Sequence, residues 1–132
     1  MILVDSSVWI EHFRAGTNFV LEDWVALDEV VTCWPVVQEV LQGFDDQRAF
    51  ALARDAMIAF SIVESPLGAE VFGAAVDLYR SARRAGIAVR SSVDCLIAAC
   101  ALRNGLAVLH QDRDFDGLAR IAPLAVQNLR RA

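Results

Sequence analysis

The stretch Arg90-Ser91-Ser92-Val93-Asp94-Cys95-Leu96-Ile97-Ala98-Ala99-Cys100-Ala101-Leu102 predicts an apolar helix that carries one carboxylate on its first turn. Ser91 or Ser92 is a candidate N-cap, and Gly105 follows where the helix should end. An acid in a first turn interacts favourably with the positive end of the helix dipole. Asp94 therefore has a purely structural explanation, and a chemical role for it depends on where the other acids lie.

Size and composition fit one globular domain covering residues 1–132. With 132 residues and 56% hydrophobic residues, the chain can bury a substantial core. No apolar run approaches the roughly 20 residues that span a bilayer, and Asp5 comes too early for a signal peptide. We expect a soluble cytoplasmic protein with no membrane partner. The high apolar content also predicts that another chain covers part of the surface.

The cysteines and histidines do not predict a zinc site. Cys33, Cys95 and Cys100 are odd in number, lie among apolar residues and lack paired metal-ligand spacing. We interpret them as reduced core residues, and we expect no zinc site at His12 or His110.

The basic residues are all arginines, and their distribution is uneven. A net charge of −5 argues against binding nucleic acid through bulk electrostatics. Arginine does suit phosphate contact and stacking on unpaired bases. Several arginines gather in sequence: Arg80, Arg83, Arg84 and Arg90, then Arg130 and Arg131. A local phosphate-binding surface and ordinary solvated helix faces with a charged tail both remain open.

Short apolar runs alternate with segments of helical periodicity. The runs at 1–4 and 106–109 have the composition of buried strands, and shorter strands are expected at 31–33, 60–63 and 123–126. Helical spacing of apolar residues covers 8–13, 19–30, 36–41, 47–59, 69–85 and 91–102. One apolar stripe is interpreted as core: Phe50, Leu52, Ala53, Met57 and Ile58. This alternation predicts an α/β fold, a three-layer α/β/α domain with a central, mostly parallel sheet.

Acids follow two of the expected strands. Asp5 follows the first strand and Asp112 follows the run at 106–109, so both belong at the carboxyl edge of a parallel sheet. If the helices that bear Glu39 and Asp94 begin at the same edge, four carboxylates share one pocket. Their repulsion would raise their pKa values unless a cation lies between them. Oxygen ligands suit Mg²⁺ or Mn²⁺, and in-line phosphoryl transfer is the recurring chemistry of such sites.

Four segments together match one known family in residue type and order. They are Ile2-Leu3-Val4-Asp5-Ser6-Ser7-Val8-Trp9, Val36-Val37-Gln38-Glu39-Val40-Leu41-Gln42-Gly43, Ser92-Val93-Asp94-Cys95-Leu96-Ile97-Ala98 and Val108-Leu109-His110-Gln111-Asp112-Arg113-Asp114-Phe115. With these segments the chain resembles a PIN-domain ribonuclease, more narrowly a VapC-type toxin of a bacterial toxin–antitoxin pair. The resemblance implies a sheet flanked by helices, a Mg²⁺- or Mn²⁺-dependent endoribonuclease, a homodimer, and a cognate VapB-type antitoxin whose C-terminal segment blocks the site.

The resemblance also assigns roles to residues. The expected catalytic acids are Asp5, Glu39, Asp94 and Asp112, with Asp5, Asp94, Asp112 and Asp114 as candidate metal ligands and Ser7 as the residue that supports Asp5. His110 departs from the Thr or Ser of many relatives, and Ser6 from the commoner Thr. Trp9 and Phe115 are interpreted as core aromatics.

Arg90 and Arg113 lie nearest to these acids in sequence and are the candidate RNA contacts. A water nucleophile needs no ribose 2′-OH, so RNA selectivity should come from shape and from single-stranded loops, as in tRNA or rRNA. By resemblance, the cut RNA keeps a 5′ phosphate.

Three rival functions are weighed against the ribonuclease. A receiver domain needs a Lys partner, and this chain has no Lys; a phosphatase would want a second Asp where Ser7 stands. A catalytically inactive PIN-like module that only binds RNA or protein stays open as the alternative, although all four acids are present.

Overall fold

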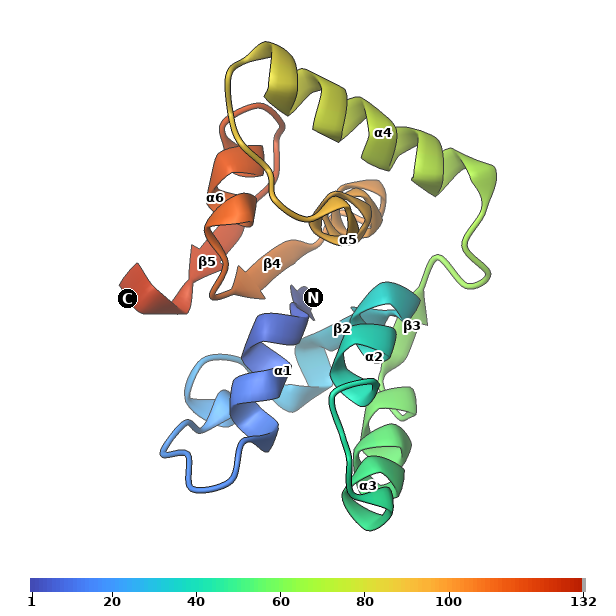
Figure 1. Cartoon of the computed structure of the whole chain (residues 1–132), viewed down its shortest axis with the longest axis vertical. Coiled ribbons are helices and arrows are strands. Elements are labelled where there is room, and N and C mark those ends of the chain that lie inside the picture. Colours follow the sequence, from blue (N-terminus) through green and yellow to red (C-terminus); the bar gives the residue numbers. More distant parts are fainter. Residues whose placement is uncertain (132) are drawn as a thin grey trace.

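A five-stranded parallel sheet lies between two layers of helices (Figure 1). The computed structural model describes residues 1–131. The strands are β1 (Ile2–Val4), β2 (Val30–Cys33), β3 (Ser61–Val63), β4 (Ala107–His110) and β5 (Val126–Asn128), in the order β3-β2-β1-β4-β5. All neighbouring strands are parallel, and Leu3 of β1 pairs with Val31 on one side and Val108 on the other. The predicted α/β/α architecture is confirmed.

The helices divide into two groups (Figure 1). On one side of the sheet lie α1 (Ser6–Phe13), α2 (Trp34–Leu41) and α3 (Gln47–Ile58), and on the other lie α4 (Ala69–Arg84), α5 (Ser92–Arg103) and α6 (Arg113–Ala119). The chain moves from β1 to the β3 edge and then returns to β4 and β5. Since crossovers between parallel strands are right-handed, this reversal puts the two groups on opposite faces. No described helix is long and apolar enough to cross a membrane.

The core is built around the central strands and α5. Leu3 and Val108 are completely buried, and α5 is enclosed along most of its length. Trp9 and Phe115 are buried as predicted. The three cysteines are buried and free of disulfides.

Several predicted elements were wrong in detail. Residues 19–29 contain two 3₁₀ turns (Leu21–Asp23 and Leu27–Glu29) instead of an α-helix, and only Leu21 and Val25 of this stretch are fully buried. The last strand begins at Val126, later than expected, and α6 was not predicted at all.

The apolar stripe assigned to α3 is only partly core. Ala53 and Met57 are buried, whereas Leu52 is 65% exposed and Ile58 48% exposed. Helix α3 packs on α2 and not on the sheet, so only a narrow stripe of its surface is buried. Phe50, the last member of the predicted stripe, is half-buried.

Candidate functional site

Asp5 ends β1 and begins α1. Its Oδ2 accepts the Ser7 backbone N–H at 3.1 Å and the Ser7 hydroxyl at 2.5 Å. Asp5 is the N-cap of this helix, because its extended backbone aims the carboxylate at the first turn. The Ser7 hydroxyl oxygen also accepts the Gln111 backbone N–H at 3.0 Å. Ser7 therefore supports Asp5 and ties the end of β1 to the segment after β4.

Five carboxylates from four segments of the chain converge at the carboxyl edge of the sheet. Ligand atoms of Asp5, Glu39 and Asp94 lie within 4.8 Å of one another, and the same holds for Asp94, Asp112 and Asp114. We call these five residues the acidic centre. Asp94 belongs to both groups, so it lies between them.

Burial makes the acidic centre costly without a cation. Desolvation raises the pKa of Asp94 to about 9, helped by the charges of Asp5 and Asp112. Desolvation also raises the pKa of Asp5 to about 6, against the hydrogen bonds from Ser7. Within the described chain, Asp5 Oδ1 and Asp94 Oδ2 are buried without hydrogen-bond partners. Carboxylate oxygens in this state fit a divalent cation that prefers oxygen ligands, such as Mg²⁺ or Mn²⁺.

Glu39 reaches the acidic centre from α2. This helix starts directly after β2 with Pro35 in its first turn, where the missing N–H costs nothing. Ser6 donates its hydroxyl to Glu39 Oε1 at 2.8 Å. The half-buried carboxylate is thereby oriented while its other oxygen stays available.

Asp114 has a structural duty as well. Its Oδ2 accepts the backbone N–H groups of Arg90 (3.0 Å) and Ser91 (3.1 Å), which holds the segment that leads into α5. Its own backbone N–H donates to Asp112 Oδ1 at 2.9 Å, so Asp112 caps α6. The backbone contacts of Asp114 could not be foreseen, because they depend on how two distant segments meet.

An open pocket of about 670 Å³ adjoins the acidic centre. It is lined by Ser7, Arg90, Gln111, Asp112, Arg113, Asp116, Asn128 and Arg130. The guanidinium of Arg90 lies 3.7 Å from Asp112 Oδ1 and 3.8 Å from Asp114 Oδ1, and its side chain is 60% exposed. Arg90 and Arg113 thus stand where a phosphate backbone could approach the acids. The side chain of Arg131, the other predicted basic residue of the tail, lies outside the described part.

His110 forms a network that sequence reasoning missed. Its Nδ1 accepts the Asp112 backbone N–H at 3.1 Å, and its Nε2 lies 3.5 Å from Asp116 Oδ1. Asp116 Oδ2 accepts the Asn128 side-chain amide at 2.8 Å. His110 is fully buried, and it belongs to neither of the described metal-ligand groups, which contain only carboxylates. The only sequence signal was a histidine in place of Thr or Ser.

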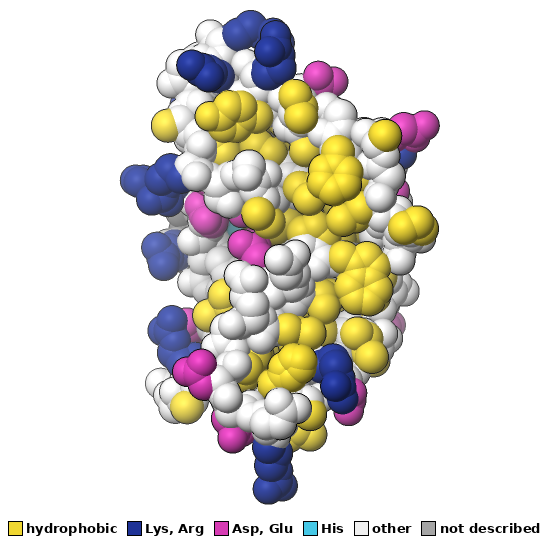
Figure 2. Space-filling model, turned by 45° about the vertical axis from the view of Figure 1, so that its right-hand side comes forward, with side chains coloured by type: hydrophobic (Ala, Val, Ile, Leu, Met, Phe, Trp, Pro, Cys, Tyr) yellow, Lys and Arg dark blue, Asp and Glu magenta, His cyan; other side chains and the backbone are white. Residues whose placement is uncertain are grey.

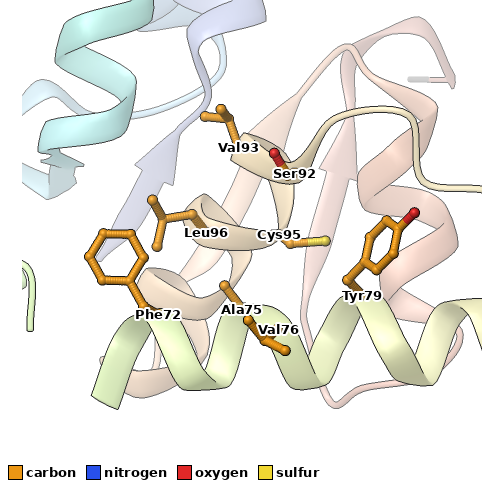
Figure 3. Close-up of a pocket in the computed structure, with 8 residues that line it drawn as sticks. All are labelled: Phe72, Ala75, Val76, Tyr79, Ser92, Val93, Cys95 and Leu96. Carbon is orange, nitrogen blue, oxygen red and sulfur yellow. The ribbon is translucent and has the colours of Figure 1, made fainter. Parts of the chain in front are cut away.

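An apolar groove lies between α4 and α5, close to the acids. Its volume is about 390 Å³, and it is lined by Phe72, Ala75, Val76, Tyr79, Ser92, Val93, Cys95 and Leu96 (Figure 3). We call it the α4–α5 groove. Phe72, Val76 and Tyr79 are 48%, 56% and 41% exposed, and Figure 2 shows a broad hydrophobic area with acidic side chains at its edge.

Comparison with known proteins shows the family of this chain. The PIN domain family model matches residues 2–121, nearly the whole chain, and the chain belongs to the PIN-domain family.

Among its curated relatives, the VapC ribonuclease Mb1587 of Mycobacterium bovis and ribonuclease VapC11 of Mycobacterium tuberculosis are each 41% identical over 98% of this chain and 100% of their own length. VapBC-5 of Mycobacterium tuberculosis, a solved member of the VapBC family of toxin–antitoxin systems, has the same fold. Its TM-score is 0.71 at 22% identity, and the match covers 97% of this chain and 98% of that one.

Proposed function

We propose that this chain is the endoribonuclease toxin of a toxin–antitoxin pair and hydrolyses phosphodiester bonds in structured RNA with Mg²⁺ or Mn²⁺. Its relatives at 41% identity are VapC ribonucleases. The observation that carries the proposal is the acidic centre, in which five carboxylates meet and two buried oxygens have no hydrogen-bond partner in the described chain.

The position of each acid indicates its role. Asp5 and Asp94 would hold the principal ion, and Asp112 with Asp114 would hold or position a second. Bound at these oxygens, a divalent ion supplies an activated water and neutralises charge on the leaving oxygen. Glu39, held by the Ser6 hydroxyl, would orient the attacking water.

Arg90 and Arg113 place the RNA. Both line the open pocket beside the acids, where the planar guanidinium suits phosphate oxygens. Because a water nucleophile does not use the ribose 2′-OH, selectivity comes from the shape of an unpaired loop, such as those of tRNA or rRNA. The product then carries a 5′ phosphate.

A VapB-type antitoxin would occupy the α4–α5 groove. Ser92 and Val93 line the groove and directly precede Asp94, so a segment lying in it ends at the acidic centre. Such a segment needs apolar residues for the groove and a basic residue for the acids. We also expect the chain to form a homodimer.

Sequencing of RNA ends tests the proposal. The chain would be expressed with and without the product of its neighbouring gene, alongside an Asp94→Asn variant. We expect new RNA ends with 5′ phosphates only when the unmodified chain is expressed alone. If Asp94→Asn yields the same ends, the acidic centre is not the active site. If no chain yields new ends although the protein binds RNA, the inactive binding module is correct.

A further inference from the structure

A second basic surface lies at the end of α4, outside the pocket next to the acids. Arg80, Arg83 and Arg84 are exposed, and together with Tyr79 they line a hollow of about 360 Å³. Tyr79 and Arg83 also line a neighbouring hollow of about 350 Å³ with residues 86–89. Figure 2 shows basic side chains gathered at this end of the molecule. We call Tyr79, Arg80, Arg83 and Arg84 the α4 basic cluster.

Several arginines elsewhere in the molecule form ion pairs, although Arg48, Arg113, Arg120 and Arg130 do not within the described residues. Arg14 pairs with Glu11, Arg54 with Asp55, and Arg103 with Glu64 and Glu70. In the described chain, no carboxylate lies within ion-pair distance of Arg80, Arg83 or Arg84, although acids outnumber bases by 17 to 12.

Helix stability does not account for the whole cluster. Arg83 and Arg84 belong to the last turn of α4, where cations interact favourably with the helix dipole. Arg80 lies before that turn, and Tyr79, at the end of the α4–α5 groove nearest these arginines, exposes an aromatic ring that gains nothing from the dipole. An exposed aromatic ring among unpaired arginines is the composition with which proteins bind unpaired RNA, by stacking a base and contacting phosphates.

The α4 basic cluster connects to the catalytic pocket. The segment from Gly86 to Ser91 joins α4 to α5 and lies against α6: a Cβ on Gly117 would come within 2.9 Å of Ile87 Cγ2. The same segment ends at Arg90, which Asp114 holds by its backbone and which lines the pocket with Arg113. The arginines of α4, of the joining segment and of the start of α6 therefore follow one connected stretch of surface.

We propose that the α4 basic cluster is an RNA-binding surface that holds unpaired substrate nucleotides away from the scissile bond. Arg80, Arg83 and Arg84 contact backbone phosphates, and Tyr79 stacks on a base. This inference rests on the proposed ribonuclease function and adds a second contact region to it. It explains how a chain of net charge −5 holds RNA beside a cluster of acids.

The test measures RNA binding in proteins silenced by Asp94→Asn, with bulk tRNA as the probe, Mg²⁺ held constant and NaCl varied. The triple variant Arg80→Gln/Arg83→Gln/Arg84→Gln is compared with Arg14→Gln/Arg48→Gln/Arg54→Gln, which removes the same charge from α3 and the end of α1. For three lost phosphate contacts, we expect the slope of log affinity against log salt to fall by about two units, with affinity reduced about tenfold or more at low salt. The control should keep its slope.

Variants of Tyr79 test base stacking without changing the charge of the protein. Tyr79→Phe keeps a flat aromatic face and should bind tRNA like the parent, whereas Tyr79→Leu should bind roughly tenfold more weakly. Thermal melting of every variant checks that the fold is retained.

Several outcomes would overturn the inference. They are equal slopes for the two triple variants, equal binding by the Tyr79 variants, or loss of the neighbouring gene product from the α4 variant while tRNA binding is unchanged. The last result would assign the surface to a protein partner. None of them touches the proposed function, which stands or falls on the RNA ends.

Discussion

At the scale of single residues, Asp94 is the acid whose burial lowers stability most and whose position is most central to the predicted metal site. Asp94→Asn should abolish RNA cleavage, lowering it by at least about a thousandfold, because the acid shared by both ligand groups is lost. Without metal at pH 8, the same variant should melt about 3–8 °C higher, since folding no longer requires Asp94 to take up a proton far above its unfolded pKa. Cleavage assays and calorimetry measure the two effects.

The control for this variant is Asp77→Asn, an exposed acid on α4. It should leave cleavage and melting temperature unchanged. Asp116 is not a suitable control, because it lies 3.5 Å from His110 and bonds to Asn128. Equal loss of cleavage at Asp77 and Asp94 would point to a general charge effect.

The raised pKa values predict how pH changes stability. The folded-state pKa values of Asp5, about 6, and Asp94, about 9, lie above the unfolded value of about 3.9, so the folded protein holds more protons between these limits. The contribution of these two groups to the free energy of unfolding of the metal-free protein should therefore be complete below about pH 4. It should be lost as the pH rises to about 9. Melting curves in EDTA across this range measure the loss.

Added Mg²⁺ should restore stability most at the alkaline end, where the carboxylates are ionised. Asp94→Asn should flatten the curve above about pH 7, leaving only the contribution of Asp5. A metal-free protein that melts at the same temperature at pH 5 and pH 9 would contradict the assigned burial of these acids.

The acids could be predicted from sequence because each stands next to a recognisable element. Asp5 follows an apolar strand, and Asp94 begins an apolar helix. The clamp from Asp114 to the backbone of Arg90 and Ser91 could not be predicted, since 24 residues separate Asp114 from Arg90 and only packing brings them together. The contact of His110 with Asp116 could not be predicted either, because it also depends on packing.

At the scale of elements, Gly117 sets how α6 meets the segment before α5. A Cβ at this position would lie 2.9 Å from Ile87 Cγ2, on a β-branched side chain that rotates with difficulty. Gly117→Ala should therefore destabilise the fold by about 1 kcal/mol, although alanine favours helices. Combining it with Ile87→Ala should recover about 0.5–1 kcal/mol relative to additive losses. Chemical denaturation measures all three variants.

Gly73 provides the matched control. It lies within α4, and an added Cβ would meet nothing within 4 Å. Gly73→Ala should stabilise the protein by about 0.5–1 kcal/mol through helix propensity alone. If both alanines stabilise to the same extent, Ile87 does not restrain Gly117.

Helices and strands were predicted correctly where the pattern of apolar residues was clear. The prediction failed where burial depends on how the elements pack together. The strands β1 and β4 are continuous apolar runs because helices cover both their faces. The periodicity of α3 overstated its burial, because a helix packed on α2 has little partner surface. The short helix α6 was missed because only its cap, Asp112, signals it.

At the scale of the whole molecule, part of the exposed apolar surface lies in the α4–α5 groove. The α4–α5 groove carries three large side chains that are each more than 40% exposed, and it ends beside the acidic centre. The double variant Phe72→Glu/Val76→Glu should therefore release the antitoxin from a co-expressed complex. Leu52→Glu, at an apolar residue of α3 that is 65% exposed, should not. Retention of the partner by the groove variant would place the interface elsewhere.

The acidic centre predicts what the antitoxin brings to it. A segment lying in the groove reaches Asp94 through Val93, and a bound metal is displaced cheaply only if a cation replaces it among the carboxylates. An arginine suits this place, because its fork can bond to two acids at once. Substituting that arginine by alanine should restore RNA cleavage while the complex still elutes together, because the groove contacts persist. Recovery of cleavage only after the complex dissociates would show that the antitoxin inhibits by covering the substrate path, with no cation entering the acidic centre.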